Sequence, residues 1–374
     1  MTSPPPGQWG PPPAGPPGPP VGPPYGAAPW GPQQPPGPPK RGNGLKWVLG
    51  AVVLIVVVAV TVGATLLFTG SGSRDNPPTG TSSTPTTSGV ASDIASANDI
   101  GPVEVLTSEA TCAAWTAVNN DLANVEMNGW DKRDPAIPAT AWTPDQRAQF
   151  EAVAAALRRA ADAAVPLARQ TQHRVMRELY EQFIAYGRAY ADTVPTYSEA
   201  DDHLVRVSVG TAAAISSICD AITYGAAAAR APYLPDPARM SRTAPPGDPS
   251  NPQRFLTTID PICADWTALV SQFTADSAEW RAIDPNIPAS QWDPAQRAVY
   301  RAVEPVMRDF ANSADALGRS STNPILRDFA VLAAQYRRAY AYALETYGPA
   351  DSYLQRAASS AVGTVSEACA AAGI

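Results

Sequence analysis

The sequence predicts an all-α protein: a disordered proline-rich tail and one transmembrane helix, then two tandem four-helix-bundle-like domains, each stapled by a disulfide. Three observations predict this architecture. Of the 41 prolines among the 374 residues, 18 lie before Lys40, in a stretch with almost nothing that can build a core. An uncharged apolar stretch of transmembrane length follows. The remaining chain repeats itself at an offset of about 150 residues, without runs of alternating β-branched residues.

The N-terminal part is predicted to consist of a tail (residues 1–46), a membrane span (residues 47–69) and a stalk (residues 70–92). The span has no charged residue, and at about 1.5 Å per residue its helix is on the order of 33 Å long, enough to cross a hydrocarbon core of about 30 Å. Its length and its late start argue against the alternative, a cleaved signal peptide. The stalk is rich in Gly, Ser, Thr and Pro, a composition typical of flexible linkers.

The charges beside the span predict its orientation. Lys40, Arg41 and Lys46 precede it without any acidic residue, whereas Arg74 on the far side is followed at once by Asp75. This bias favours a single-pass plasma-membrane protein with a cytoplasmic N-terminus and extracytoplasmic C-terminal domains. All four cysteines lie in that outer part, where disulfides can form.

Two copies of one helical domain are predicted, over residues 93–231 and 253–374, with a proline-rich linker at residues 232–252. The aligned residues lie at an offset of 150, or 151 for the first cysteine of each copy. They include Trp130 with Trp280, Ile137-Pro138-Ala139 with Ile287-Pro288-Ala289, Trp142 with Trp292, Arg147 with Arg297, Arg188 with Arg338, Cys219 with Cys369, and Cys112 with Cys263. A match this long indicates duplicated domains and not a solenoid of short units.

Each copy is expected to contain four helices. The predicted ranges are 103–128, 144–168, 172–193 and 199–229 in the first copy, and 254–279, 294–318, 324–346 and 350–371 in the second. The second helix has the clearest start, because Thr143 or Asp293 supplies an N-cap that is followed by a proline and, two residues later, a glutamine.

The duplication favours one disulfide in each copy, Cys112 with Cys219 and Cys263 with Cys369, among the three pairings that four cysteines allow. In an up-down-up-down bundle, the start of the first helix lies beside the end of the fourth, where these cysteines stand. By the chain-entropy model, closing a loop of about a hundred residues contributes on the order of 4 to 5 kcal/mol to stability.

The repeated proline-rich loop supplies the first candidate ligand- or partner-binding residues. Trp142 and Trp292 could form a stacking platform for a sugar ring or a peptide. The alternative, which we favour, is structural: each tryptophan folds back over the helix end and over Arg147 or Arg297, four or five residues further on.

Arg188 and Arg338 are the other candidates, because they recur within tyrosine-rich helices. Their planar guanidinium groups could bind a carboxylate or a phosphate inside the bundle. The simpler interpretation is that they pair with the matched acids Asp201 and Asp351 or lie along the surface.

No catalytic residue, metal site or cofactor is expected. Asp134 with Asp201, and Asp284 with Asp351, form the paired carboxylates that a glycosidase needs, but turn initiation and helix starts explain them more simply. Neither histidine has a histidine counterpart in the other copy, which excludes a shared metal or acid–base role. The net charge of −7 argues against nucleic-acid binding.

The runs Pro11-Pro12-Pro13 and Pro35-Pro36-Gly37-Pro38-Pro39, the short Lys-Arg patch, the valine-rich span and the Thr/Ser/Pro stalk resemble the proline-rich single-pass membrane proteins of mycobacteria and related actinobacteria, a family of unknown function. The resemblance covers roughly the first 92 residues and rests on composition. It implies a location in the cell envelope and no particular activity.

The function that we predict is that of a non-enzymatic, membrane-anchored envelope protein whose duplicated helical ectodomain binds another envelope component. The proline-rich tail could also dock a cytoplasmic partner that recognises PxxP-type motifs. The alternative is an extracytoplasmic sensor of a small molecule or lipid that enters a bundle. An extracytoplasmic hydrolase is a third hypothesis, which we do not favour.

Overall fold

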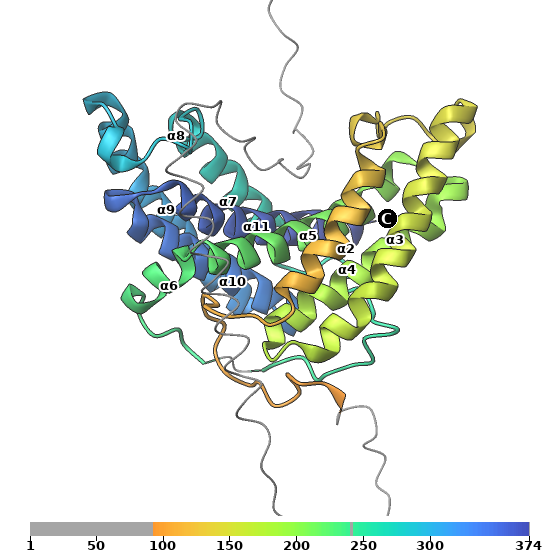
Figure 1. Ribbon diagram of the computed structural model, residues 1–374, viewed down its shortest axis with the longest axis horizontal. Helices are drawn as coiled ribbons and strands as arrows, with labels where there is room; N and C mark the ends of the chain where they lie inside the picture. Colours follow the sequence, from red (N-terminus) through yellow and green to blue (C-terminus); the bar gives the residue numbers. More distant parts are fainter. Residues whose placement is uncertain (1–92, 240–241, 374) are drawn as a thin grey trace, which may run out of the picture. The chain divides into compact units, whose positions relative to one another are not determined.

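The computed structural model describes residues 93–239 and 242–373, all of which belong to one compact unit (Figure 1). The predicted tail, membrane span and stalk lie outside the described residues. Every regular element within residues 93–239 and 242–373 is a helix, which confirms the all-α prediction.

The long helices of the two repeats correspond in order. Those of the first repeat are α2 (Cys112–Glu126), α3 (Pro144–Gln170), α4 (Arg174–Thr193) and α5 (Asp202–Thr223), followed by the short α6 (Ala226–Arg230). Those of the second are α7 (Cys263–Asp276), α9 (Pro294–Ser320), α10 (Pro324–Ala343) and α11 (Ser352–Ala371), with the short α8 (Ala278–Arg281) after α7.

Single 3₁₀ turns connect the helices, and three of them recur at equivalent positions. The turns η3 (Ala139–Ala141), η4 (Val194–Thr196) and η5 (Glu199–Asp201) of the first repeat correspond to η7 (Ala289–Gln291), η8 (Leu344–Thr346) and η9 (Pro349–Asp351) of the second. The first repeat also contains η2 (Trp130–Lys132) and η6 (Ala231–Tyr233). The predicted capping boxes at the starts of α3 and α9 are present, with Thr143 and Asp293 as N-caps.

Both first helices begin nine residues later than predicted, at Cys112 and Cys263. The residues just before them form no regular helix or strand, and each segment has a backbone group bonded to the other repeat. The Leu106 N–H donates to the Tyr336 hydroxyl at 3.2 Å, and the Leu256 N–H donates to the Tyr186 hydroxyl at 3.4 Å. Each pair lies 150 residues from the other, so the two repeats exchange equivalent contacts. Hydrophobic side chains of both segments, such as Leu106 and Leu256, are buried in the core. These hydrophobic residues made the segments look like the first turns of a buried helix.

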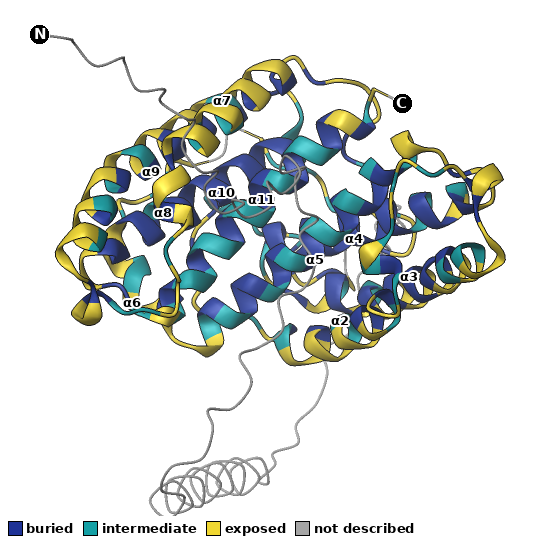
Figure 2. Ribbon diagram, turned by 90° about the horizontal axis from the view of Figure 1, so that it is seen from above, coloured by how far each residue is buried: buried dark blue, intermediate teal, exposed yellow. Residues whose placement is uncertain are grey.

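The packing of α5 against α11 is more extensive than that of any other pair of helices. The two helices are antiparallel: His203 near the start of α5 contacts Glu367 near the end of α11, and Tyr224, just after α5, stacks on Tyr353 near the start of α11. Figure 2 shows the buried residues concentrated on α4, α5, α10 and α11, with exposed residues on the outer helices. The two repeats therefore share one hydrophobic core.

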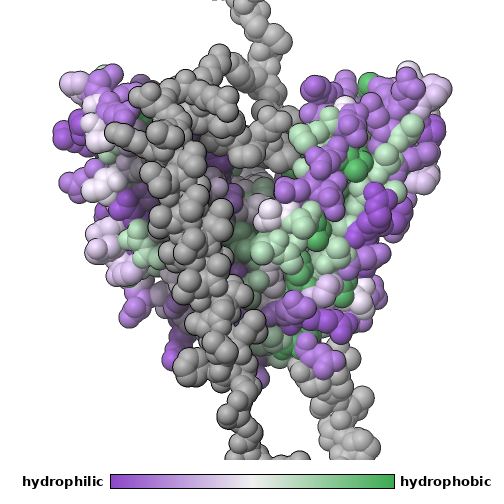
Figure 3. Space-filling view, viewed as in Figure 1, coloured by the Kyte–Doolittle hydropathy of each residue, from purple (hydrophilic) through white to green (hydrophobic). Residues whose placement is uncertain are grey.

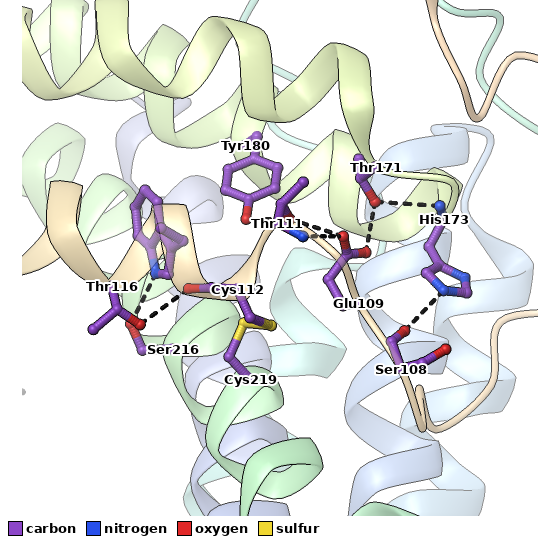
Figure 4. Close-up of a disulfide and its surroundings, with 11 residues drawn as sticks. Ser108, Glu109, Thr111, Cys112, Thr116, Thr171, His173, Tyr180, Ser216 and Cys219 are labelled. Carbon is purple, nitrogen blue, oxygen red and sulfur yellow. Dashed lines mark hydrogen bonds between the residues drawn. A yellow bond between two sulfur atoms is a disulfide. The ribbon is translucent and has the colours of Figure 1, made fainter. Parts of the chain in front are cut away.

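Both disulfides pair as predicted. Cys112 is bonded to Cys219 and Cys263 to Cys369, with Cα–Cα distances of 5.4 and 5.7 Å. Figure 4 shows the first bridge, which ties the start of α2 to α5. The equivalent bridge ties the start of α7 to α11, so each disulfide holds an outer helix against one of the two central helices.

Among the described residues, the stretch Glu199–Thr223 is long and apolar enough to cross a membrane, judged by length and composition alone. Its most apolar window is 61% buried, and it includes α5, which packs between α4 and α11. It is a core helix of this fold, and it is distinct from the span predicted at residues 47–69.

Gly210 on α5 allows the closest approach of α5 to α11. A Cβ atom at this position would lie 2.7 Å from the Thr364 hydroxyl oxygen and 3.5 Å from the Thr364 backbone. We predict that Gly210→Val lowers the free energy of unfolding by about 1–3 kcal/mol, because it overpacks the interface. Gly363→Ala is the matched control, since nothing lies within 4 Å of its Cβ position, and it should be neutral or stabilising. Urea denaturation followed by circular dichroism measures both, and equal effects would contradict the prediction.

Candidate functional site

The two candidate tryptophans are buried. Trp142 stacks on Phe150 with ring centroids 3.9 Å apart, and its indole N–H donates to the Ile137 carbonyl at 2.9 Å. Trp292 repeats this arrangement on Tyr300, at 3.6 Å. Aromatic side chains of this kind bury a large area and use their polar atom in one hydrogen bond. Neither ring presents the open face that a stacking platform needs.

Arg147 and Arg297 stand at equivalent positions of the repeats but make different contacts. The Arg147 guanidinium donates to the Ala139 carbonyl at 2.7 Å and lies 5.6 Å from the Trp142 ring centroid. Arg297 is exposed and lines a shallow pocket of about 380 Å³ together with residues of η7 and η8. Of the two, only Arg297 therefore has its guanidinium at an open pocket.

Arg188 and Arg338 lie along the surface, which is one of the two positions that the sequence suggested for them. Arg188 donates to Asp162 on α3 at 2.6 Å, and Arg338 donates to Asp315 on α9 at 3.0 Å. The interpretation that pairs them with Asp201 and Asp351 is wrong, because those acids belong to other contacts. Both arginines join neighbouring helices of their own repeat, and Arg188 also donates to the Ser250 carbonyl in the linker at 2.6 Å.

The acids that suggested a hydrolase have structural partners. Asp134 accepts the Ala136 N–H at 3.0 Å and Asp284 accepts the Asn286 N–H at 2.9 Å, as turn-forming aspartates do. The Asp201 carboxylate accepts a hydrogen bond from the Ser198 N–H at 2.8 Å, within the capping box at the start of η5. In the part of the chain that the structure describes, no group of three or more His, Cys, Asp or Glu side chains could hold a metal ion.

The histidines also occupy different places. His173 lies just before α4, where its Nε2 is 3.1 Å from the Ser108 carbonyl (Figure 4). His203 is 2.7 Å from Glu367 across the interface between α5 and α11. The contact with Glu367 is the first cause of the raised pKa of His203. Both side chains thus serve packing between segments.

Sequence analysis missed a buried charged cluster that joins the two repeats. Arg174, at the start of α4, donates to Asp328 on α10 at 2.6 Å and to the Asp99 carbonyl at 2.7 Å. The side chains of Arg174 and Asp328 are 3% and 0% exposed. An ion pair this deeply buried is sensitive to the loss of either partner, because the remaining charge would be left without compensation.

Glu178 completes the cluster on the same face of α4. Its carboxyl group lies close enough to that of Asp328 for their charges to interact, and both side chains are 0% exposed. Burial, followed by the charge of Asp328, raises the pKa of Glu178 well above its usual value. Two buried carboxyl groups this close cannot both ionise at low cost, so burial and the charge of Asp328 favour the protonated form of Glu178, while Arg174 favours the charged form of Asp328.

One sequence signal could have revealed the cluster. Arg174, Arg177, Glu178 and Glu181 recur at intervals of three and four residues, so they share one face of α4. Such a face is normally solvated, and the sequence contains no sign that α10 covers it.

A second feature that sequence analysis missed is the path of the chain after α5. Residues 224–233, here called the strap, leave the first repeat and lie on the second. Arg230 donates to both oxygens of Asp351, at 2.9 and 2.8 Å, and to the Thr346 hydroxyl at 2.8 Å. Figures 1 and 2 both show α6, the helix of the strap, on the side of α10 and α9.

Comparison with known proteins indicates a mycobacterial relationship. The model of a family described as "Mycobacterial ESX-1 associated protein" matches residues 94–373. An uncharacterized protein of Mycolicibacterium smegmatis (strain MKD8) is 48% identical over 346 residues, covering 92% of this chain and 90% of that protein. Because this match is longer than residues 94–373, the similarity continues N-terminal to the described part. No solved structure matches.

The ion pair between the repeats yields a prediction for stability. Asp328→Asn should lower the free energy of unfolding by about 3 kcal/mol, because it removes the closest acid from the buried Arg174 and leaves only the longer contacts with Asp99 and Glu178. The exposed pair of Arg158 and Asp192 supplies the control. Asp192→Asn should cost less than about 1 kcal/mol, since surface pairs are screened by solvent. Urea unfolding at neutral pH measures both variants, and similar losses would show that the buried pair is not a stabilising contact.

Glu126 yields a prediction for pH dependence. Burial raises its pKa from 4.5 to about 7. The folded protein therefore keeps this proton over a range in which the unfolded chain has released it, so stability falls as pH rises from about 4.5 to about 7. The loss should be about 3 kcal/mol. Glu126→Gln should flatten this part of the curve, whereas Glu151→Gln, at an exposed position, should not. Urea denaturation at a series of pH values tests the slope.

Proposed function

The chain belongs to the family of mycobacterial ESX-1 associated proteins, and from that premise we propose that it is a membrane-anchored cell-envelope protein whose duplicated helical part binds a component of the ESX-1 system. This role is non-enzymatic. The two repeats act as tandem bundle-like domains, residues 93–231 and 253–374, which the stalk holds outside the membrane. The proline-rich tail tethers the protein to a cytoplasmic partner.

The observation that carries this proposal is the way in which the two repeats are joined. The interface of α5 and α11, the shared core and the buried pair of Arg174 with Asp328 make one body of two related halves. The repeated aromatic and proline residues are used up in internal packing. The surfaces of the two halves differ, and a body of this kind is suited to present two related surfaces at a constant separation.

Two further observations support the location. Disulfides persist in oxidising compartments, and the described part contains two of them. The similarity to the M. smegmatis protein continues into the N-terminal part, which includes residues predicted as tail, span or stalk.

The surface supports an interaction role as well. In Figure 3, hydrophilic residues dominate the outer edges of the described part, while hydrophobic residues are visible around α2. Apolar area surrounded by polar residues is the kind of surface that a protein partner covers.

A second candidate function, a sensor of an anionic small molecule or lipid, is favoured by Arg337. Its side chain is buried between Phe273 and Phe310, with the guanidinium carbon 4.8 and 5.6 Å from the two ring centroids. It donates to the Ser359 hydroxyl at 2.9 Å, and no ion pair to it is found among the described residues. Burial lowers its pKa to about 10. A buried cation without an anion is a feature that a ligand carboxylate or phosphate would complete.

We predict that the full-length chain, tagged and cross-linked in living mycobacteria, co-purifies with components of the ESX-1 system through its helical repeats. The control keeps the tail, span and stalk and lacks residues 93–374. Quantitative mass spectrometry should find the ESX-1 components enriched with the full chain and at background with the control. Equal recovery from both would overturn the role of the repeats. Migration on a non-reducing gel verifies that the purified chain retains its disulfides.

A further inference from the structure

The strap shows which chemistry the second repeat recognises. It is a short alanine-rich helix that ends in Arg230. At its two ends, Tyr224 stacks on Tyr353 with centroids 5.0 Å apart, and Tyr233 stacks on Tyr342 at 4.9 Å. Between them, Arg230 forms a bidentate contact with the Asp351 carboxylate. A planar guanidinium can bond to both oxygens of one carboxylate, so Arg230 makes the contact of the strap specific for an acidic side chain.

The strap covers a recognisable area of the second repeat. In that area Ala339 and Ala343 are 0% exposed and Asp351 is 4% exposed. The residues at the same positions of the first repeat, 150 residues earlier, are Ala189, Thr193 and Asp201, and all three are partly exposed. The equivalent area of the first repeat is thus not covered by any described residue to the same extent.

The first repeat nevertheless contains the same two side chains that accept hydrogen bonds from Arg230 in the second repeat. Thr196 stands where Thr346 stands, and Asp201 where Asp351 stands, each pair on equivalent 3₁₀ turns. The two aspartates are also held alike. Asp201 accepts the Ser198 N–H at 2.8 Å, and Asp351 accepts the Gly348 N–H at 2.9 Å.

The two equivalent aspartates differ in whether an arginine is bonded to them. Asp351 receives Arg230, whereas within the described part of the chain no arginine is bonded to Asp201. The surroundings also differ in charge, because Asp192 replaces Tyr342 and His203 replaces Tyr353. Asp192 is paired with Arg158, and its side chain is 74% exposed. The surface of the first repeat is therefore suited to a basic segment with less aromatic character than the strap.

We propose that this surface, formed by Ala189, Asp192, Thr193, Thr196 and Asp201, docks an arginine-bearing segment of a partner protein. The segment has the chemistry of the strap: a short helix of small residues whose terminal arginine binds Asp201 and Thr196. A second copy of this chain is a poorer occupant, because its own strap is already held by Asp351. The inference rests on the proposed interaction role and names the surface and the chemistry of the partner.

The test uses a synthetic peptide with the sequence of residues 225–232, which lacks the two tyrosines of the strap, labelled with fluorescein as the probe, and the purified full-length chain. Fluorescence anisotropy should show saturable binding. Replacing the arginine of the peptide with glutamine should weaken binding about tenfold or more, because a hydrogen-bonded charge pair is lost. Asp201→Asn in the protein should weaken binding to a similar degree.

Two further variants complete the design. Ala189→Arg places a charge in the same area without touching the cap at Ser198, and it should also abolish binding. Asp121→Asn removes one exposed acid from α2 and should leave binding unchanged. Circular dichroism and the non-reducing gel verify that each variant is folded.

Several outcomes would overturn the proposal. They are an absence of binding at about 1 mM peptide, binding that does not depend on the arginine, and binding that does not depend on Asp201. Loss of binding in Asp351→Asn and not in Asp201→Asn would show that the peptide merely exchanges with the strap. If the peptide fails while co-purification with the ESX-1 system persists, the docking surface is wrong and the proposed role stands.

Discussion

The close packing of α5 against α11 is the constraint on which the rest of the structure depends. Gly210 lets the two helices approach at Thr364, and this approach merges the hydrophobic residues of both repeats into one core. Once the central helices are in contact, the segment before each first helix can reach the other repeat. The reciprocal hydrogen bonds of Leu106 and Leu256 depend on that geometry. Each disulfide then secures an outer helix to one of the two central helices.

The repeats have diverged where they meet. Arg174 of the first repeat corresponds to Pro324 of the second, and the pair that it forms with Asp328 exists only once. A buried ion pair is weak evidence for added stability, since removing two charges from water costs about as much as their attraction returns. Its effect is selective, because an arrangement that separates Arg174 from Asp328 removes from each buried charge its closest partner. The pair therefore disfavours other registers between α4 and α10.

The strap shows that the surfaces of the two halves differ even where their aromatic packing is repeated. The tryptophans and tyrosines of the two halves make the same contacts. By contrast, the area around Asp351 is covered by the chain itself, and the area around Asp201 is not. A duplicated domain can in this way use one copy of a docking surface to join its halves and offer the other copy to a partner.

The sequence by itself determined the helical class, the duplication, the N-caps of α3 and α9 and the pairing of the cysteines, because each follows from periodicity or from a comparison of the chain with itself. Only the tertiary structure decided where α2 and α7 begin, where Arg188 and Arg338 find their acids, and that the charged face of α4 is buried. These features depend on residues far apart in the chain. A helical pattern shows which side chains share a face, but it does not show whether water or another helix lies against that face.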